Sequence, residues 1–133
     1  MIHRLAIRVY YEDTDFSGAV YHANYLRYFE RGRTEFLRAC GVNQLAAFES
    51  VEPDRAFVFM VRSMTVDWLK PARMDDLVTV ETQVERLGPA ALELAQRLLR
   101  EDQVLTNATV RVACVIKGRA ARIPSWVREK LEL

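Results

Sequence analysis

The sequence predicts an α+β domain in which an antiparallel sheet of about five strands wraps around one long central helix. Three observations lead to this prediction. Apolar residues alternate in residues 1–10, they recur with helical spacing in residues 23–40, and four strand-like runs follow Pro53. The sequence contains no second long helix, so the apolar face of such a sheet can be buried only against the helix that precedes it.

A strand and a turn open the chain. Alternation in the first ten residues places Leu5, Ile7 and Val9 on one face of the strand, and Tyr11 continues that face. Residues 13–18 follow as a cluster of turn-forming residue types that includes two aspartates, a serine and a glycine. We therefore expect the chain to leave the sheet here and enter the helix.

The long helix is predicted over residues 23–40, and Gly41 stands where a helix C-terminus favours glycine. A short helix is predicted over residues 43–48, with Asn43 as its candidate N-cap. Gly32 lowers helix propensity in the middle of the long helix, so we expect close contact there with the sheet or with a partner subunit. The apolar face of the long helix carries Tyr25, Phe29, Gly32, Phe36 and Cys40.

Strand-like runs make up most of the second half of the chain. They cover residues 56–69, 77–87, 92–100 and 104–116. The breaks between them suit hairpin connections, at residues 70–72, 88–89 and 101–103. We therefore expect these runs to pair antiparallel, with a last amphipathic turn or two after Pro124.

Composition excludes several classes of function. The 133 residues are expected to form one domain over residues 1–133, and a net charge of +1 gives no electrostatic footprint for a nucleic acid. No apolar run approaches the length of a membrane span and no signal peptide is recognisable, so we expect a cytoplasmic protein. With two cysteines, Cys40 and Cys114, and two histidines, His3 and His22, we expect no disulfide framework, no metal and no cofactor.

The most informative segment is residues 11–25, which carries two aspartates, a glycine and a histidine immediately before the long helix. A helix N-terminus offers unpaired N–H groups and a positive dipole end that can stabilise a developing oxyanion. A carboxylate just upstream, partly shielded by Phe16, Tyr21 and Tyr25, is a candidate nucleophile or general base. The alternative is that the two aspartates only stabilise the turn and cap the helix.

Two stretches of sequence resemble a known family. The first is residues 8–41, RVYYEDTDFSGAVYHANYLRYFERGRTEFLRACG, which is similar to the Tol–Pal-associated, YbgC-type acyl-CoA thioesterases of the 4-hydroxybenzoyl-CoA thioesterase branch. The second is residues 67–77, DWLKPARMDDL, which resembles the strand–turn–strand segment of that family. The resemblance implies the hotdog fold, hydrolysis of an acyl-CoA thioester without a cofactor, and a homodimer that often pairs into a dimer of dimers.

The resemblance also implies roles for individual residues. Asp15 matches the catalytic carboxylate of the family, whereas Asp13 is expected to stabilise the turn. Backbone N–H groups near Tyr21 and His22 are expected to polarise the thioester carbonyl, and the His22 side chain to add a hydrogen bond. Further substrate contacts are expected from Gly18, Val20 and Tyr11.

Contacts to the coenzyme A phosphates are expected from Arg62 and Arg73, although both are equally explained as surface charges at strand ends. Some relatives carry a basic run at the turn that corresponds to residues 88–91, but here that turn reads Gly-Pro-Ala-Ala. The nucleotide therefore meets other residues or lies in solvent, and the second option also admits an acyl-carrier protein as the acyl donor.

Residues 57–61 present more apolar surface than one helix can cover, which predicts that two subunits join edge to edge into one continuous sheet. Two other functions stay open. One is a hotdog hydratase or dehydratase acting on acyl thioesters, and the other is a non-catalytic module that binds acyl-CoA or an acyl-carrier protein. The loop that contains Asp13 and Asp15 favours the thioesterase over the hydratase.

Overall fold

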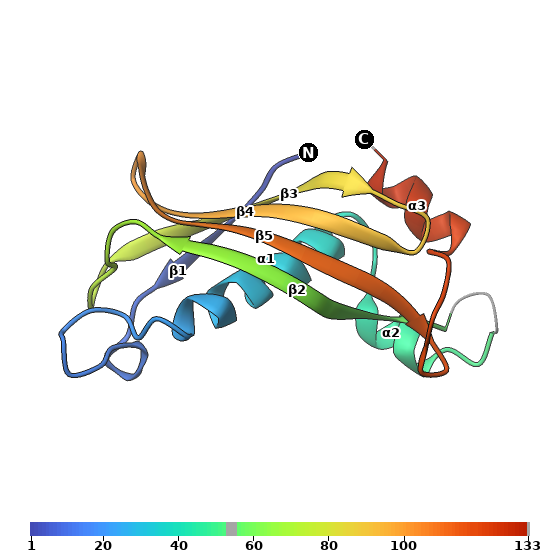
Figure 1. Cartoon of the computed structure of the whole chain (residues 1–133), viewed down its shortest axis with the longest axis horizontal. Helices are drawn as coiled ribbons and strands as arrows, with labels where there is room; N and C mark the ends of the chain where they lie inside the picture. Colours follow the sequence, from blue (N-terminus) through green and yellow to red (C-terminus); the bar gives the residue numbers. More distant parts are fainter. Residues whose placement is uncertain (53–55, 133) are drawn as a thin grey trace.

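The structure is an antiparallel sheet wrapped around the helix α1 (Asn24–Ala39), as Figure 1 shows. The computed structural model describes residues 1–52 and 56–132, so that Pro53, after which strand periodicity is predicted, lies outside the described residues. The strands in the described part are β1 (His3–Arg8), β2 (Val58–Trp68), β3 (Leu77–Leu87), β4 (Ala91–Arg100), β5 (Gln103–Ile116) and the short β6 (Arg119–Ala120). The smaller helices are a 3-10 turn (Tyr11–Asp13), α2 (Gln44–Glu49) and α3 (Ser125–Leu131). The predicted α+β architecture is confirmed.

The strand order β1-β3-β4-β5-β2 corrects one predicted connection. β3 pairs with β4 and β4 with β5 across hairpins, as predicted, but β2 lies at the far edge and pairs with β5 rather than with β3. The reason is that residues 69–76 bond to the N-terminal segment. The Val9 N–H donates to the Asp76 carbonyl (2.9 Å), and the Asp75 N–H donates to the Val9 carbonyl (3.0 Å). These bonds bring β3 beside β1.

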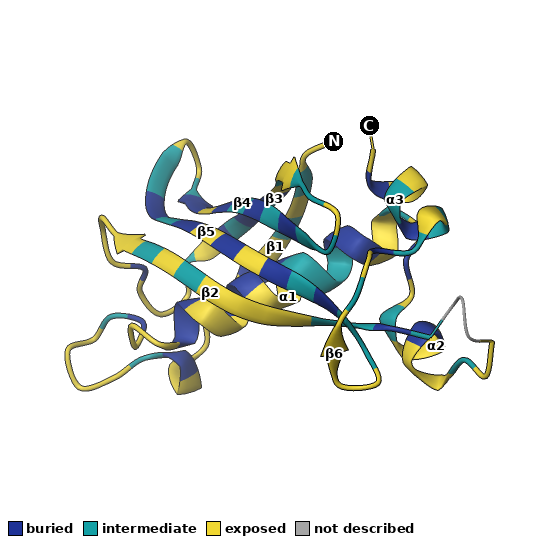
Figure 2. Ribbon diagram, turned by 45° about the vertical axis from the view of Figure 1, so that its right-hand side comes forward, coloured by how far each residue is buried: buried dark blue, intermediate teal, exposed yellow. Residues whose placement is uncertain are grey.

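The core lies between α1 and the face of the sheet that is turned toward it. Buried and exposed residues alternate along β5 (Figure 2), and its buried residues include Val110, Val112 and Cys114. Burial of each large apolar side chain contributes about 1.5–3 kcal/mol, so this interface supplies much of the driving force for folding. From α1 the buried residues are Asn24, Tyr25, Tyr28, Phe29, Gly32, Phe36 and Leu37.

Two residues do not lie on the buried apolar faces that the sequence predicts for them. Tyr11 lies in the 3-10 turn and is exposed, because β1 ends at Arg8 and the chain turns away from the sheet. Cys40 is half-buried because it forms the C-cap of α1. Cys114 is buried, and burial raises the pKa of both thiols, which favours the protonated form.

The ends of the helices follow the predicted chemistry. Gly41 has φ +91°, a left-handed conformation that suits glycine after a helix, and its N–H donates to the Arg38 carbonyl at 3.0 Å. The Asn43 side chain accepts a hydrogen bond from the Ala46 N–H at 3.0 Å and so caps α2.

Gly32 marks the closest approach of α1 to the sheet. A Cβ atom at this position would lie 2.5 Å from Val80 Cγ1 and 3.1 Å from both Gln96 Nε2 and Thr82 Oγ1. Of the two contacts that the sequence predicts for Gly32, the structure shows the one with the sheet. The absence of a side chain is what allows the helix to sit this deep in the curl of the sheet.

We expect Gly32→Ala to destabilise the protein by about 1–3 kcal/mol, because overpacking against Val80 outweighs the gain in helix propensity of about 1 kcal/mol. The free energy of unfolding by urea measures this. As a matched control, Ala39→Gly at the exposed end of the same helix should cost about 1 kcal/mol or less. A Gly32→Ala variant more stable than wild type would contradict the packing argument.

Candidate active site

The loop before α1 holds one carboxylate in a fixed, exposed position. Asp15 Oδ1 accepts hydrogen bonds from the Ser17 N–H (2.8 Å) and from the Ser17 hydroxyl (2.5 Å). Gly18 completes the turn with φ +84°, and its N–H donates to the Asp15 carbonyl (3.0 Å). The other oxygen, Oδ2, has no hydrogen-bond partner among the described residues, and the Asp15 side chain is open to solvent.

The electrostatics of this turn keep Asp15 ionised. The Ser17 hydroxyl and then its N–H lower the pKa of the Asp15 carboxyl, desolvation opposes them, and the nearby His22 ring adds a smaller lowering. An ionised carboxylate with a free oxygen is the form needed by a nucleophile or a general base. The expectation that aromatic residues shield it is not met within one chain, because Phe16 is fully exposed and the Tyr25 hydroxyl instead accepts from the Ala72 N–H (3.0 Å).

Asp13 is buried, and both of its carboxylate oxygens accept hydrogen bonds. Its Oδ2 accepts from the Tyr10 N–H (2.8 Å), its Oδ1 accepts from the Asn24 side chain (2.9 Å), and its carbonyl accepts from the Tyr21 N–H (2.9 Å). Asp13 therefore ties the 3-10 turn to the first turn of α1. This geometry agrees with the role in the turn that the sequence predicts for Asp13.

His22 and Tyr21 lie at the N-terminus of α1, beside the end of β2. The ring centroids of His22 and Tyr21 are 4.6 Å apart, and the Trp68 ring meets His22 edge-on at 6.0 Å. The Trp68 indole N–H donates to the His22 carbonyl at 3.1 Å. The helix begins after Ala23 without a side-chain cap. Because Asp13 occupies the Tyr21 N–H, the His22 N–H is the better candidate for binding an oxyanion.

The second family-like stretch, residues 67–77, contacts the first, residues 8–41. Ala19 forms a β-bridge with Arg73, and the Val20 N–H donates to the Ala72 carbonyl at 2.9 Å. The buried Val20 and the exposed Gly18 thus belong to a loop that is fixed at both ends. The structure therefore brings together most of the site residues that the sequence predicts, namely Asp15, Gly18, Val20, Tyr21, His22 and Arg73.

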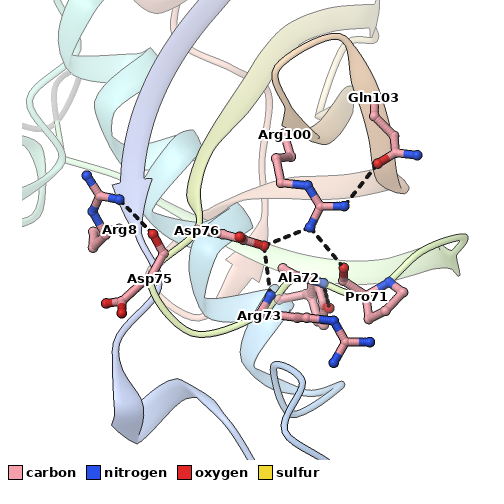
Figure 3. A network of polar contacts seen from close by, with 9 residues as sticks. Arg8, Pro71, Ala72, Arg73, Asp75, Asp76, Arg100 and Gln103 are labelled. Atoms are coloured by element: carbon pink, nitrogen blue, oxygen red, sulfur yellow. Dashed lines mark hydrogen bonds and ion pairs between the residues drawn. The ribbon is translucent and has the colours of Figure 1, made fainter.

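A polar network behind this junction fixes the connection between β2 and β3 (Figure 3). The Asp76 carboxylate accepts from the Arg73 N–H (2.9 Å) and from the Arg100 guanidinium (2.7 Å). Partial burial opposes ionisation here, but these two donors lower the pKa of Asp76 overall. Arg100 also donates to Gln103 at 3.0 Å. No sequence pattern marks Trp68, Asp76 or Arg100 as a site residue, although Trp68 and Asp76 lie within the second family-like stretch, residues 67–77.

Two predicted residues do not place their side chains at Asp15; Tyr11 contacts the loop only through its carbonyl, which accepts from the Thr14 N–H (3.0 Å) and hydroxyl (2.7 Å). Tyr11 is exposed in the 3-10 turn. Arg62 is the extra residue of a β-bulge between Val61 and Ser63, well before the Trp68 end of β2. It lines a groove of about 240 Å³ together with Arg86 and Arg111. Strand alternation places this groove on the face of the sheet that is turned away from α1, because Val112, next to Arg111, faces the helix.

Two general features of the described residues complete the site. No helix in the described ranges is long and apolar enough to cross a membrane. Within the same ranges, no group of three or more His, Cys, Asp or Glu side chains is arranged to hold a metal ion.

Comparison with known proteins identifies the family. The family model described as "Thioesterase-like superfamily" matches residues 9–131. This chain belongs to that superfamily. Its relatives include the Haemophilus influenzae protein named acyl-CoA thioesterase YbgC, which is 44% identical over 113 residues, 85% of this chain and 80% of that protein. The predicted resemblance to YbgC-type thioesterases is confirmed, whereas the association with Tol–Pal stays a prediction.

Solved structures of thioesterases share the fold of this superfamily member. A probable thioesterase from Bartonella henselae is 41% identical, with a TM-score of 0.88 over 93% of this chain and 100% of that one. The 4-hydroxybenzoyl CoA thioesterase from Pseudomonas sp. strain CBS-3 superposes with a TM-score of 0.87 over 97% of this chain and 98% of its own, at 18% identity. The second likeness concerns the fold alone, and with the family match it confirms the predicted hotdog fold.

We expect Ser17→Ala to raise the pKa of the Asp15 carboxyl toward its ordinary value, because the strongest stabilising hydrogen bond of the carboxylate is lost. A ¹³C NMR titration of the labelled carboxyl group measures the change. The exposed Ser125 lies on α3, and Ser125→Ala should leave the Asp15 titration unchanged. An unchanged Asp15 pKa in Ser17→Ala would contradict the assigned hydrogen bond.

Proposed function

We propose that this chain hydrolyses acyl-CoA thioesters, with Asp15 as the reacting carboxylate. The observation that carries the proposal is the pairing of an exposed, ionised carboxylate with the uncapped N-terminus of α1. The name of the Haemophilus influenzae relative, an acyl-CoA thioesterase, supports the same substrate class. A hydratase or a binding module has no specific observation in its favour.

The reaction follows from the two groups. The free oxygen of Asp15 attacks the thioester carbonyl carbon, or it removes a proton from a water molecule that attacks instead. Negative charge then develops on the carbonyl oxygen, where the His22 N–H and the positive end of the α1 dipole stabilise it. The C–S bond breaks and the coenzyme A thiolate leaves with the electron pair. If Asp15 is the nucleophile, water hydrolyses the resulting anhydride; both routes release the free acid.

We propose further that the working unit is a homodimer joined through β2. This strand is an open edge of the sheet, and the exposed Met60 and Val61 lie along it. An unprotected apolar edge strand is a strong pairing surface, and two-fold pairing of two β2 strands makes one continuous sheet. Such a partner would also cover the exposed Phe16, Tyr21 and Trp68 beside Asp15. Further pairing of dimers and a cytoplasmic location stay predictions.

We expect the coenzyme A or acyl-carrier part of the substrate to bind arginines outside the Asp15 loop. Arg73 is bridged to that loop through Ala19, and Arg62, Arg86 and Arg111 line the groove on the outer face of the sheet, where Arg111 pairs with Glu93 at 3.4 Å. Guanidinium groups bind phosphate oxygens in bidentate fashion, which suits the phosphates of coenzyme A or the phosphopantetheine of an acyl-carrier protein.

Replacing each aspartate in turn tests the catalytic role of Asp15 and the structural role of Asp13 separately. Asp15→Asn should reduce kcat in a thiol-release assay by at least about 10²-fold, because an amide is neither a base nor a useful nucleophile. It should leave the urea unfolding curve unchanged. Asp13→Asn should lose about 1–3 kcal/mol of stability, because either amide orientation sets an NH₂ group against a donor. Near-wild-type turnover by Asp15→Asn would disprove the catalytic assignment.

Activity should depend on the dimer. Met60→Lys introduces a charge at the β2 edge and should raise the dissociation constant of the dimer at least about tenfold, with thiol release lost at the same dilution. Ala6→Lys, an exposed change on the opposite edge strand β1, is the matched control and should dissociate like wild type. Light scattering across a dilution series measures the mass. A fully active monomer would contradict the proposed interface.

A further inference from the structure

A partly open cavity of about 140 Å³ lies between α1 and the sheet, near the β2 edge. Water occupies about 30 Å³ per molecule in the liquid, so the cavity has room for about five non-hydrogen atoms. Most of its wall is apolar. The apolar lining residues are Leu37, Phe59, Val61, Leu92, Leu94 and Val112, and the polar ones are Glu30, Arg33, Thr34 and Gln44.

The cationic group in this lining, Arg33, is held in place by a buried amide. One guanidinium nitrogen of Arg33 donates to Gln96 Oε1 at 3.0 Å. The Gln96 NH₂ group in turn donates to the Phe29 carbonyl and to the Thr82 hydroxyl, both at 2.9 Å, and Gln96 is only 1% exposed. The orientation of Arg33 is therefore fixed by the sheet, and the remaining guanidinium N–H groups stay available.

No carboxylate forms an ion pair with Arg33 within the described part of the chain. Desolvation by burial lowers the pKa of Arg33, and the charge of Glu30 only partly offsets this. The Glu30 carboxylate itself accepts a hydrogen bond from the Thr34 hydroxyl at 2.7 Å. A half-buried guanidinium that contacts an amide and no anion is an electrostatic cost that a bound carboxylate would relieve.

The cavity lies well along α1 from the helix N-terminus of its own chain, and the proposed dimer would bring the end of the partner's β2 toward it. Arg33 lies nine residues beyond Asn24, about 14 Å along the helix axis, which exceeds the reach of a short acyl group. Two-fold pairing of two β2 strands is antiparallel, so the half of β2 that carries Phe59 and Val61 would lie beside the half of the partner's β2 that ends the strand. In each subunit that half of β2 ends at Trp68, whose indole N–H donates to the His22 carbonyl at the proposed reaction centre.

We propose that Arg33 is a specificity-determining residue, which makes this cavity select short acyl groups that end in a carboxylate. The proposal rests on the proposed thioesterase function and on the β2 dimer. A succinyl group fits both the space and the charge. Beyond its thioester carbonyl it has two methylenes and one carboxylate, which matches the room for about five non-hydrogen atoms. The planar guanidinium binds that carboxylate through two parallel hydrogen bonds.

In this proposal, Glu30 determines how strongly the cavity prefers an acyl group that ends in a carboxylate. Its carboxylate shares the cavity lining with Arg33, so it repels an anionic acyl end and weakens the selection. Glu30→Gln removes this repulsion and keeps an oxygen that can accept from Thr34. Arg33→Met removes the cation and keeps an unbranched side chain. The two variants therefore change the preference in opposite directions.

The test compares succinyl-CoA with butyryl-CoA, in which a methyl group replaces the terminal carboxylate. Thiol release by the full chain gives kcat/KM for both thioesters, corrected for hydrolysis without enzyme. We expect wild type to prefer succinyl-CoA, Arg33→Met to lower the preference about tenfold or more through KM for succinyl-CoA, and Glu30→Gln to raise it. Arg31→Met, at an exposed arginine of the same helix, is the matched control and should leave the preference unchanged.

Each outcome separates the two proposals. Hydrolysis of both thioesters with no preference for succinyl-CoA in wild type overturns the role of Arg33 and leaves the thioesterase function standing. A preference that neither Arg33→Met nor Glu30→Gln changes does the same. If Arg33→Met does not fold, the Glu30→Gln result decides alone. Failure of wild type to hydrolyse any acyl-CoA in a panel of chain lengths overturns the proposed function and this inference with it.

Discussion

The close approach of α1 to the sheet at Gly32 is the contact on which the rest of this structure depends. Because no side chain separates the helix from Val80, Thr82 and Gln96, the sheet can curl around the helix and bury its apolar face. The same contact places the Gln96 amide beside the Phe29 carbonyl, from which it holds Arg33 over the cavity near β2. The position of the helix thus determines both the core and the shape of the space beside it.

The two aspartates of the loop show how burial separates the roles of identical side chains. Asp13 and Asp15 are two residues apart, yet Asp13 accepts from a backbone N–H and from the Asn24 amide inside the protein, whereas Asp15 keeps one oxygen free in solvent. The buried carboxylate fixes the entry of the chain into α1. The exposed one is then held at a constant place relative to the helix N-terminus, which is the geometry that the proposed acyl transfer requires.

In a single chain the candidate site is open to solvent. Asp15, Phe16 and Trp68 are open to solvent, and β2 offers an unpaired edge with exposed apolar side chains on the same side of the molecule as Trp68. Water-exposed charges interact weakly, so electrostatic stabilisation of an oxyanion requires that something covers this region. In the proposed dimer, a second copy paired through β2 would provide that cover and would bring the reaction centre of the other subunit toward the cavity beside Arg33.

Local patterns in the sequence determined the elements and the loop chemistry. Alternation and helical spacing predict α1, β3, β4 and β5 within one or two residues, and the caps at Gly41 and Asn43 follow from residue type alone. Asp15, Gly18 and His22 are close in the chain, so their grouping needs no long-range information. Tertiary structure alone decided that β2 pairs with β5, that Arg73 bridges to Ala19 and that Arg33 meets Gln96. These contacts join residues far apart in the chain, and the periodicity of a segment specifies which face it buries, not which partner it meets.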